Sequence, residues 1–584
     1  MRKTFLKIII WFICVCTFIS SPFGTVSAIR AEESRETQYS SIAARGVWHR
    51  PNASGRENTL QGLCSVLDEM KECGINMVFL ETFYHGMTVF KTNLAPYYTG
   101  FDQYDFGSYP DYLTAFTAEA KKRDIEVHAW VESFYIGINE SASLVKFFPS
   151  WLLVNEHGQI RHTTEGADLG GYIFFDPANP SARGYLLRLY KEILTKAPDI
   201  KGLNLDYIRY PVSDFSAGTD SGYTDVAMSA FAEKYNLTVN EENKIQNFKA
   251  QIKANSLVSE WTAYRAEQVT SFIKEVSETV NEKYQDCIIS VAIHPDITKA
   301  YNQKKQDFIS WVKNGYIDVV TPMVYHYAAD QISSALSDML AKFEGVYCYT
   351  GLYTTYHNQS TSELEKHIGA SERCGADGFV LFDSAKTFFT PAHNYSEFLS
   401  NKYGTVKPSA LPHWATDRLI HASTSIIADK LTANSESPAA VNAFMSEMQE
   451  ISLIGEQSIE SLDKTLYELA QFKEHTAASA QTTLDLLIDL LEVRKSRLSF
   501  KGCPERLEPP SDSEDEESSS DSSLEKDEES SSDSSLEPDE ESSSADGNDT
   551  HNPPLEEPTE PTSFLNLVMR FFQNIINWFK KLFA

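Results

Sequence analysis

The chain has 584 residues, enough for one large domain and additional segments, and 82 acidic against 51 basic residues give it a net charge of −31. Much of this charge lies between Glu505 and Glu560, where 22 acidic residues face only Arg506 and Lys526. Such a composition lacks the basic surface that nucleic-acid binding requires, so we expect no nucleic-acid partner.

Residues 1–28 have the three parts of a secretory signal peptide. Basic residues come first, an apolar run follows at 8–19, and small residues end the segment at Ala28. The apolar run is short for a membrane-spanning helix, and an uncleaved anchor is the alternative. We therefore expect a secreted or cell-surface protein.

Between residues 40 and 405, short apolar runs alternate with amphipathic helical patterns. The runs that we interpret as strands are 45–49, 76–81, 125–132, 202–207, 288–294, 317–325, 346–353 and 378–383. The helical patterns between them are 58–73, 110–123, 181–196, 259–284, 303–314, 331–343 and 361–374. Near-continuous apolar strands indicate a parallel sheet that is covered on both faces. Their number and order predict an α/β fold, a (β/α)8 TIM barrel, with long aromatic-rich insertions after the second, third and fourth strands.

Three segments of different character follow the predicted barrel. Residues 414–500 have helical periodicity, and we expect a helical hairpin or small bundle that serves as a spacer or packing module. Residues 503–562 repeat DEESSSDSSLEK as DEESSSDSSLEP, which predicts a disordered, extended acidic linker. Residues 563–584 predict an amphipathic helix, and Phe564–Ala584 fits docking to a membrane surface, or to a protein as the alternative.

Acidic residues at the ends of predicted strands are the candidates for chemistry. A barrel gathers the carboxyl ends of its strands around one mouth. Glycoside hydrolysis needs one carboxylic acid that protonates the leaving oxygen and one carboxylate that acts as nucleophile or as base toward water. We predict Asp206 as the nucleophile or base and Glu132 as the general acid, with Glu81 as its substitute.

Each of these assignments has an alternative. Asp206 can pair with Arg209, and Glu132 can serve to hold a neighbouring group in place. Asp296 and Asp383 are weaker candidates for catalysis, because Asp296 follows a proline and fits a turn cap. The residues that we expect to bind substrate are His128, Trp130, Tyr207, Arg209, Tyr325, His326 and Asp383.

We expect no metal and no cofactor. The chain contains no HExxH, Walker, GxGxxG or GxSxG motif. A metal site built from His128, His294 and His326 is conceivable, but no spacing supports it. The six cysteines after residue 28 show no metal-ligand spacing either, and we expect mostly free thiols.

Five segments resemble the glycosyl-hydrolase-like family 10 proteins of bacterial envelopes. These segments are RGVWHRP at 45–51, the stretch from 76 to 100, VHAWVE at 127–132, FFDPANPSARGYLLRLYKEIL at 174–194 and GLNLDYIRYP at 202–211. The resemblance implies a TIM barrel that hydrolyses cell-wall or other polysaccharide, with the family's DYIRYP aspartate at Asp206 and its H-x-W strand at His128 and Trp130. The family often has an arginine-containing motif on strand two, where this chain has FLETFYHG. This departure affects the prediction of the substrate more than the prediction of the fold.

Together these patterns predict an exported glycoside hydrolase that cleaves O-glycosidic bonds in peptidoglycan glycan strands or another polysaccharide. The alternative is a non-hydrolytic carbohydrate-binding or surface-interaction protein on a degenerate barrel. The succession of barrel, helices, acidic linker and terminal helix suits a Gram-positive bacterial surface protein.

Overall fold

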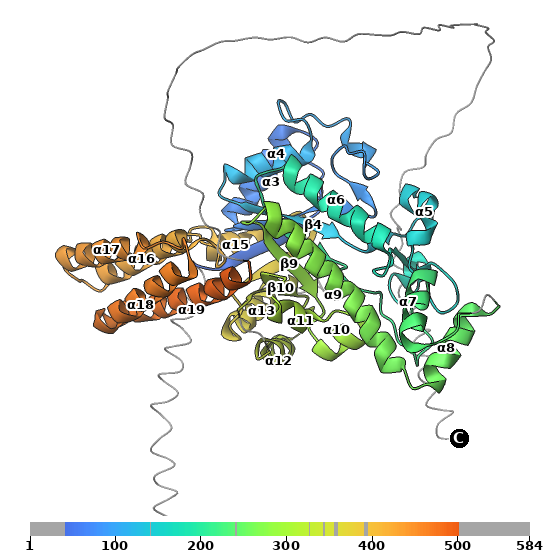
Figure 1. The fold of residues 1–584 in the computed structure, drawn as a ribbon. Helices are drawn as coiled ribbons and strands as arrows, with labels where there is room; N and C mark the ends of the chain where they lie inside the picture. Colours follow the sequence, from blue (N-terminus) through green and yellow to red (C-terminus); the bar gives the residue numbers. More distant parts are fainter. Residues whose placement is uncertain are drawn as a thin grey trace, which may run out of the picture. The chain divides into compact units, whose positions relative to one another are not determined.

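The computed structural model describes residues 41–501 except 141, 240–241, 326–327, 343–344, 355–359 and 391–394. The predicted signal peptide, acidic linker and C-terminal amphipathic helix lie outside the described residues. Figure 1 shows the described part as a ring of helices around central strands, with a group of further helices packed on it. Within the described ranges, no helix combines the length and apolar character needed to cross a membrane.

The central sheet closes into a parallel barrel. Its strand order is β1-β12-β11-β10-β9-β8-β4-β2, and β1 pairs with both β12 and β2. The strands are β1 (Ala44–His49), β2 (Met77–Tyr84), β4 (Glu126–Glu132), β8 (Ile200–Asp206), β9 (Ile288–Ile293), β10 (Val319–Pro322), β11 (Tyr347–Tyr353) and β12 (Gly378–Phe382). Each predicted strand corresponds to one of them, so the predicted (β/α)8 TIM barrel is confirmed.

Helices follow the strands and cover the outside of the barrel. The longer ones are α3 (Leu60–Glu72), α4 (Tyr112–Lys121), α6 (Pro180–Lys196), α9 (Val258–Lys283), α12 (Ala329–Leu340), α13 (Thr361–Arg373) and α15 (Tyr395–Tyr403). The predicted helix at 303–314 is divided between α10 (Ile297–Lys304) and α11 (Phe308–Lys313). Side-chain caps fix where several of them begin: Asn179 accepts hydrogen bonds from two backbone N–H groups at the start of α6, where Pro180 occupies the first helical position.

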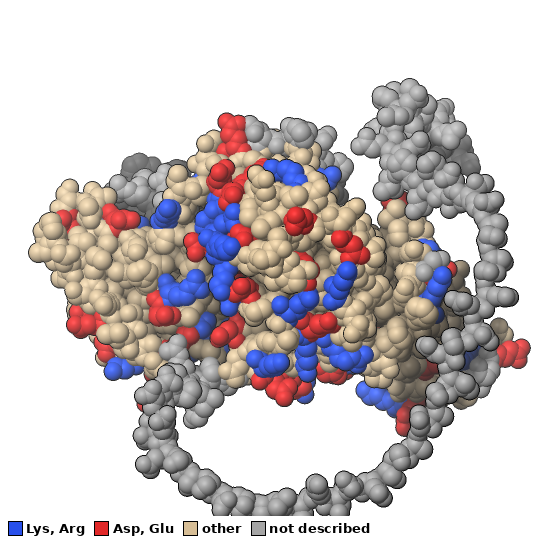
Figure 2. Space-filling view, turned by 90° about the horizontal axis from the view of Figure 1, so that it is seen from above, with Lys and Arg blue, Asp and Glu red and all other residues tan. Residues whose placement is uncertain are grey.

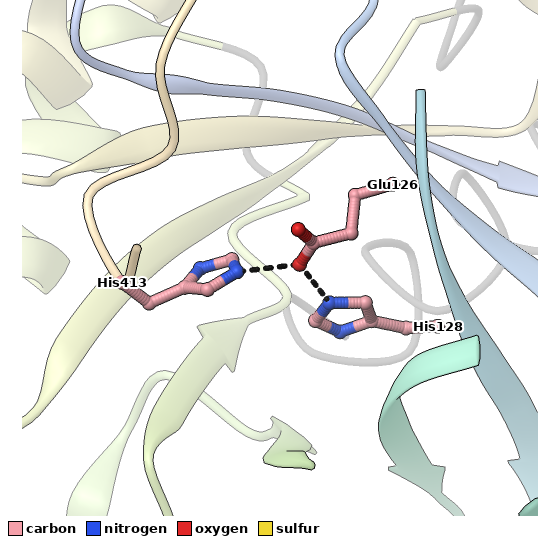
Figure 3. A group of neighbouring side chains, drawn as sticks. All are labelled: Glu126, His128 and His413. Carbon is pink, nitrogen blue, oxygen red and sulfur yellow. Dashed lines mark hydrogen bonds and ion pairs between the residues drawn. The ribbon is translucent and has the colours of Figure 1, made fainter. Parts of the chain in front are cut away.

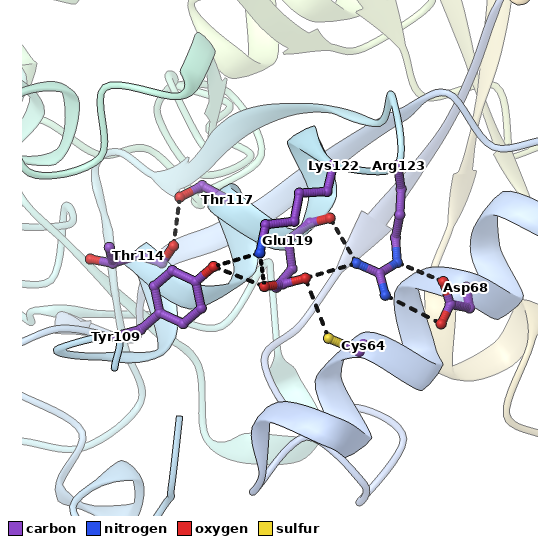
Figure 4. A network of polar contacts seen from close by, with 8 residues as sticks. All are labelled: Cys64, Asp68, Tyr109, Thr114, Thr117, Glu119, Lys122 and Arg123. Atoms are coloured by element: carbon purple, nitrogen blue, oxygen red, sulfur yellow. Dashed lines mark hydrogen bonds and ion pairs between the residues drawn. The ribbon is translucent and has the colours of Figure 1, made fainter. Parts of the chain in front are cut away.

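A polar network joins α3 to α4 on the surface of the barrel (Figure 4). Glu119 on α4 accepts hydrogen bonds from Tyr109, Lys122 and Arg123 and from the Cys64 thiol on α3. Arg123 also pairs with Asp68, at 2.6 Å between Nε and Oδ1. Cys64, Cys73, Cys287, Cys348 and Cys374 form no disulfide bond among the described residues, in agreement with the predicted thiols.

Insertions extend the carboxyl end of the barrel after β2, β4 and β8, as predicted. The first contains β3 (Met87–Thr88), which pairs antiparallel with β2, and a 3-10 turn at Thr99–Phe101. The second contains α5 (Ser143–Phe147), two 3-10 turns (Pro149–Trp151 and Ala167–Leu169) and a small antiparallel sheet of β5 (Tyr135–Gly137), β7 (Tyr172–Phe174) and β6 (Arg161–His162). The third contains α7 (Asp225–Tyr235) and α8 (Lys244–Ala254), whose core includes Phe231, Phe248 and Trp261.

The predicted helical region consists of α16 (Thr416–Ala433), α17 (Pro438–Ser452), α18 (Ile459–His475) and α19 (Ala478–Lys501), which we call the helical module. Its apolar side chains share one core with barrel residues such as Trp48 and Tyr349. Arg497 on α19 contacts the segment directly before β10. Its Nε lies 3.2 Å from Asp318 Oδ1, and its Nη2 donates a hydrogen bond to the Gly315 carbonyl. The module is therefore packed against the barrel at the amino-terminal end of the strands, which we call the floor.

Candidate active site

Three carboxylates meet at the carboxyl end of neighbouring strands. Glu132 and Asp206 are the last residues of β4 and β8 and are paired in register, while Glu81 on β2 is paired with Trp130 on β4. The exposed fractions of Glu81, Glu132 and Asp206 are 1%, 2% and 9%. The structure therefore brings together all three acids that the sequence nominated for catalysis.

Asp206 is held by two hydrogen-bond donors. The Tyr207 backbone N–H donates to Oδ1 at 2.7 Å, and the Trp130 indole N–H donates to Oδ2 at 3.2 Å. Burial raises the pKa of Asp206, and the charge of Arg209 and these two donors oppose that rise. Donors aimed at both oxygens stabilise the carboxylate form, which is the form that a nucleophile or base needs.

Glu132 and Glu81 form an electrostatically linked pair. Burial raises the pKa of both carboxyls, and the charge of each neighbouring acid raises it further. Glu132 Oε2 accepts the His85 backbone N–H at 2.8 Å, and Glu81 Oε2 lies 3.8 Å from Arg50 Nη1. Because Arg50 favours the anion more strongly at Glu81 than at Glu132, the pair retains its proton preferentially on Glu132.

Arg50 is a residue of this site that the sequence reasoning missed. It follows β1 directly, and its guanidinium lies over the rings of Tyr84 and Trp130, at 5.0 and 5.1 Å from their centres. Burial lowers the pKa of Arg50, but the charges of Glu81 and Glu132 overcome this and raise it. The sequence pattern that could have identified Arg50 is its position directly after the first strand, since Glu132 and Asp206 also lie at strand ends.

Tyr325 and Asp383 face the three acids across the mouth, since Tyr325 follows β10 and Asp383 follows β12. Burial raises the pKa of Tyr325, and the charges of Asp206, Tyr353 and Asp383 add to this effect. Asp383 follows β12, adds to the rise in the pKa of Glu81, and caps α14 (Ser384–Thr387) by accepting the Lys386 N–H. A cavity of about 1120 Å³ is lined by Tyr325 together with His294 and Lys304.

Arg209 does not form the ion pair with Asp206 that was the alternative to catalysis. Its Nη1 lies 2.6 Å from Glu165 Oε1, and Lys304 Nζ lies 3.1 Å from the same oxygen. Its guanidinium covers the Tyr207 ring at 4.6 Å, so Arg209 connects the DYIRYP segment to the insertion that follows β4. Asp206 therefore remains available at the mouth, with Arg209 acting on it only through its charge.

One of the two histidines predicted to bind substrate, His128, does not join this group. His128 lies on the floor side of Trp130, is fully buried and bonds to Glu126 at the start of β4. A side chain two residues below Trp130 on the same face of the strand does not reach the mouth. His326 lies outside the described residues. Asp296 caps α10, as expected from its position after a proline.

Acidic and basic side chains are interspersed over much of the face in Figure 2. Aromatic rings lie beside the three acids and Arg50 at the mouth. The Tyr207 ring packs on Tyr135 at 4.7 Å between ring centres, and Tyr135 packs on Tyr172 at 4.6 Å. Flat apolar faces beside buried carboxyls suit a ligand with pyranose-like faces and many hydroxyl groups.

Comparison with known proteins gives one family and several distant relatives. The family model described as glycosyl hydrolase-like 10 matches residues 43–365. The glycosyl hydrolase DigH of Escherichia coli (strain K12) is 21% identical over 341 residues, which cover 53% of this chain and 70% of DigH. The glycosyl hydrolase YngK of Bacillus subtilis (strain 168) is 22% identical over 346 residues, covering 56% of this chain and 60% of YngK.

Among solved structures, the catalytic domain of a β-amylase from Paenibacillus polymyxa matches with a TM-score of 0.42 and 12% identity, over 63% of this chain and 99% of that domain. The family match covers more than half of the chain and includes β1 to β11 and the acids Glu81, Glu132 and Asp206. This chain belongs to the glycosyl hydrolase-like 10 family.

Proposed function

We propose that this protein is an exported glycoside hydrolase that cleaves O-glycosidic bonds in a polysaccharide, either the glycan strands of peptidoglycan or another environmental glycan. The observation that carries the proposal is the meeting of Glu81, Glu132 and Asp206 at one barrel mouth in environments that differ. One acid that keeps its proton and one that is held as an anion are the two parts that glycoside hydrolysis requires.

In this proposal Glu132 donates its proton to the leaving glycosidic oxygen. Burial and the charge of Glu81 keep the pKa of Glu132 above its ordinary range, so the carboxyl carries a proton near neutral pH. Arg50 lies 3.8 Å from Glu81 and opposes the rise in the pKa of Glu81, so the proton that the pair shares stays preferentially on Glu132. Glu81 is the substitute donor, because burial raises its pKa as well.

Asp206 acts on the opposite side of the sugar as nucleophile, or as base toward water. Its two N–H donors fix the carboxylate and favour its charged form before the substrate arrives. The rings of Tyr84, Tyr207 and Tyr325 form the walls on which sugar rings stack, and Asp383 accepts hydrogen bonds from sugar hydroxyls at the rim.

A screen with a matched pair of variants tests the proposal. The purified protein is incubated with peptidoglycan and with common plant and host polysaccharides, and newly formed reducing ends are counted. We expect the wild type to hydrolyse at least one polymer. The rate of hydrolysis should fall by about 10²–10⁴-fold in Glu132→Gln. Glu278→Gln removes an exposed acid on α9 and should keep full activity. Binding of a glycan without any hydrolysis would contradict the proposal and favour the carbohydrate-binding alternative.

The proposed location is the outside of a bacterial cell, with the signal at 1–28 removed and Phe564–Ala584 docked to a membrane surface or a protein. The sequence pattern of the two termini supports this proposal. N-terminal sequencing of the protein recovered from the cell surface or medium should give a chain that begins directly after Ala28. Recovery of the uncleaved chain from the cell interior would contradict it.

A further inference from the structure

A second group of polar side chains lies at the floor of the barrel, remote from the mouth (Figure 3). Glu126 and His128 alternate at the start of β4, so both side chains point into the barrel. His413 comes from the segment between α15 and α16, which leads from the barrel into the helical module. The exposed fractions of Glu126, His128 and His413 are 12%, 0% and 4%.

The three side chains converge on a single point. His413 Nε2 lies 2.6 Å and His128 Nε2 lies 3.0 Å from the same oxygen, Glu126 Oε1. One ligand atom from each residue lies within 4.8 Å of the other two. Zinc binds imidazole nitrogen and carboxylate oxygen at about 2.0–2.2 Å in tetrahedral geometry, which separates ligand atoms by about 3.4 Å. Shifts of about 1 Å or less would bring these atoms to that spacing.

Outer groups hold two of the three side chains in the orientation that a metal needs. The Tyr349 hydroxyl lies 2.5 Å from His413 Nδ1, and the Trp414 indole N–H donates to Glu126 Oε2 at 3.1 Å. Metal-bound histidines and carboxylates have such partners on their remaining polar atoms, because these partners set the tautomer and the ring angle.

The His128 ring is fixed by packing. It lies against Gly202 on β8, where an added Cβ would be 2.4 Å from His128 Nδ1. A larger residue at 202 would therefore displace the ring. Gly202, the first residue of the GLNLDYIRYP segment, therefore leaves room for the His128 ring at the floor, whereas Asp206 of the same segment lies at the mouth.

We propose that Glu126, His128 and His413 bind a divalent transition-metal ion, with zinc as the ion that fits best. Two imidazoles and one carboxylate suit zinc rather than calcium or magnesium, which prefer oxygen ligands throughout. The site lies below the Trp130 layer and is enclosed by protein, so the ion is structural. It clamps β4 to the segment that enters the helical module, and this inference is independent of the proposed hydrolase activity.

The test compares zinc binding by untagged, chelator-stripped protein and two matched variants. His413→Gln keeps an amide N–H that can donate to Glu126 but removes the imidazole ligand, whereas His421→Ala removes an exposed histidine on α16. We expect one tightly bound zinc per chain in the wild type and in His421→Ala, and affinity about 100-fold or more weaker in His413→Gln. Zinc should raise the Tm of the first two proteins and not of the third.

Cobalt provides an independent readout of the same site. Bound Co²⁺, with a water molecule as its fourth ligand, should give the intense visible absorption of a four-coordinate centre in the wild type. This absorption should be absent in His413→Gln. If His413→Gln fails to fold, Tyr349→Phe replaces it, because it removes only the hydroxyl beside His413 and should weaken zinc binding by about 10-fold. No stoichiometric zinc in the wild type, or equal affinity in wild type and the site variants, would overturn the proposal and leave a hydrogen-bonded His–Glu–His cluster.

Discussion

At the scale of single residues, two carboxyl groups at the mouth of the barrel, those of Asp206 and Glu132, have different surroundings. Asp206 accepts N–H donors on both of its oxygens, whereas Glu132 accepts one and faces a second buried acid. Burial raises the pKa of both acids, but the donors and the charge of Arg209 limit the rise at Asp206, whereas the charge of Glu81 adds to the rise at Glu132.

Replacing the Trp130 indole tests what limits the rise in the pKa of Asp206. Trp130→Phe keeps an aromatic ring but removes the N–H that donates to Asp206 Oδ2, so the pKa of Asp206 should rise further. We expect the acidic limb of the kcat/KM profile to move up by about one pH unit. Trp311→Phe is the matched control, since it removes an indole donor to Thr270 between α9 and α11. An acidic limb that stays in place in both variants would contradict this role of Trp130.

The raised pKa of Glu132 also predicts a cost in stability. Between its ordinary pKa near 4.5 and its raised pKa, the folded protein binds a proton that the unfolded chain has lost, so the free energy of unfolding falls as the pH rises. Glu132→Gln removes this ionisable group and should be more stable than wild type at pH 7 by about 1–3 kcal/mol, since one pKa unit is about 1.4 kcal/mol. Urea unfolding at pH 7 and at about pH 3 measures the effect.

The difference should vanish at about pH 3, where the carboxyl is largely neutral in both the folded and the unfolded state. Glu278→Gln, which changes an exposed acid, should match wild type at both values. A Glu132→Gln variant that is less stable than wild type at pH 7 would show that this acid is ionised in the folded protein.

At the scale of elements, one carboxylate helps to attach the insertion after β4 to the segment that follows β8. Glu165 lies between β6 and the 3-10 turn at Ala167–Leu169, and it accepts hydrogen bonds from Arg209, Lys304 and the Val212 backbone. Burial alone would raise the pKa of Glu165, but the charges of Arg209 and Lys304 overcome this and lower it to about 2.

Removing that charge should loosen the insertion. Glu165→Gln leaves buried Arg209 and half-buried Lys304 without this counter-charge and should lower the free energy of unfolding at pH 7 by about 3–5 kcal/mol. The wild-type advantage should shrink as the pH falls from about 4.5 towards 2, where the carboxylate of Glu165 takes up its proton. Glu140→Gln is the control, because it breaks an exposed pair with Arg161 in the same insertion. Equal losses in the two variants would contradict a special role for Glu165.

The strands and the acids that end them could be predicted because buried parallel strands are continuous apolar runs that stand out from the helical patterns. Glu165 could not, because it lies in an irregular polar segment, and no local pattern indicates which turn folds back onto β8. Arg50 directly follows a predicted strand, but no pattern in the sequence indicates that its guanidinium lies beside Glu81.

At the scale of the whole molecule, the barrel and the helical module share one apolar core, and the side chains that join them are far apart in sequence. His413 and Glu126 are separated by 287 residues, and Arg497 and Asp318 by 179. The sequence correctly predicted helices at 414–500 but not their contact with the floor, because helical periodicity identifies an apolar face without identifying its partner. The two ends of the barrel therefore differ: the mouth holds the three acids proposed for catalysis, and the floor holds the contacts with the helical module.

The most direct test of the central claim is the turnover of Asp206→Asn on the glycan that the wild type hydrolyses. The substitution keeps the size of the side chain and its acceptor oxygen but removes the negative charge, so circular dichroism and Tm should report an intact fold. We predict that glycan hydrolysis falls below detection in this variant. An unchanged rate of hydrolysis with the fold intact would contradict the account of this site.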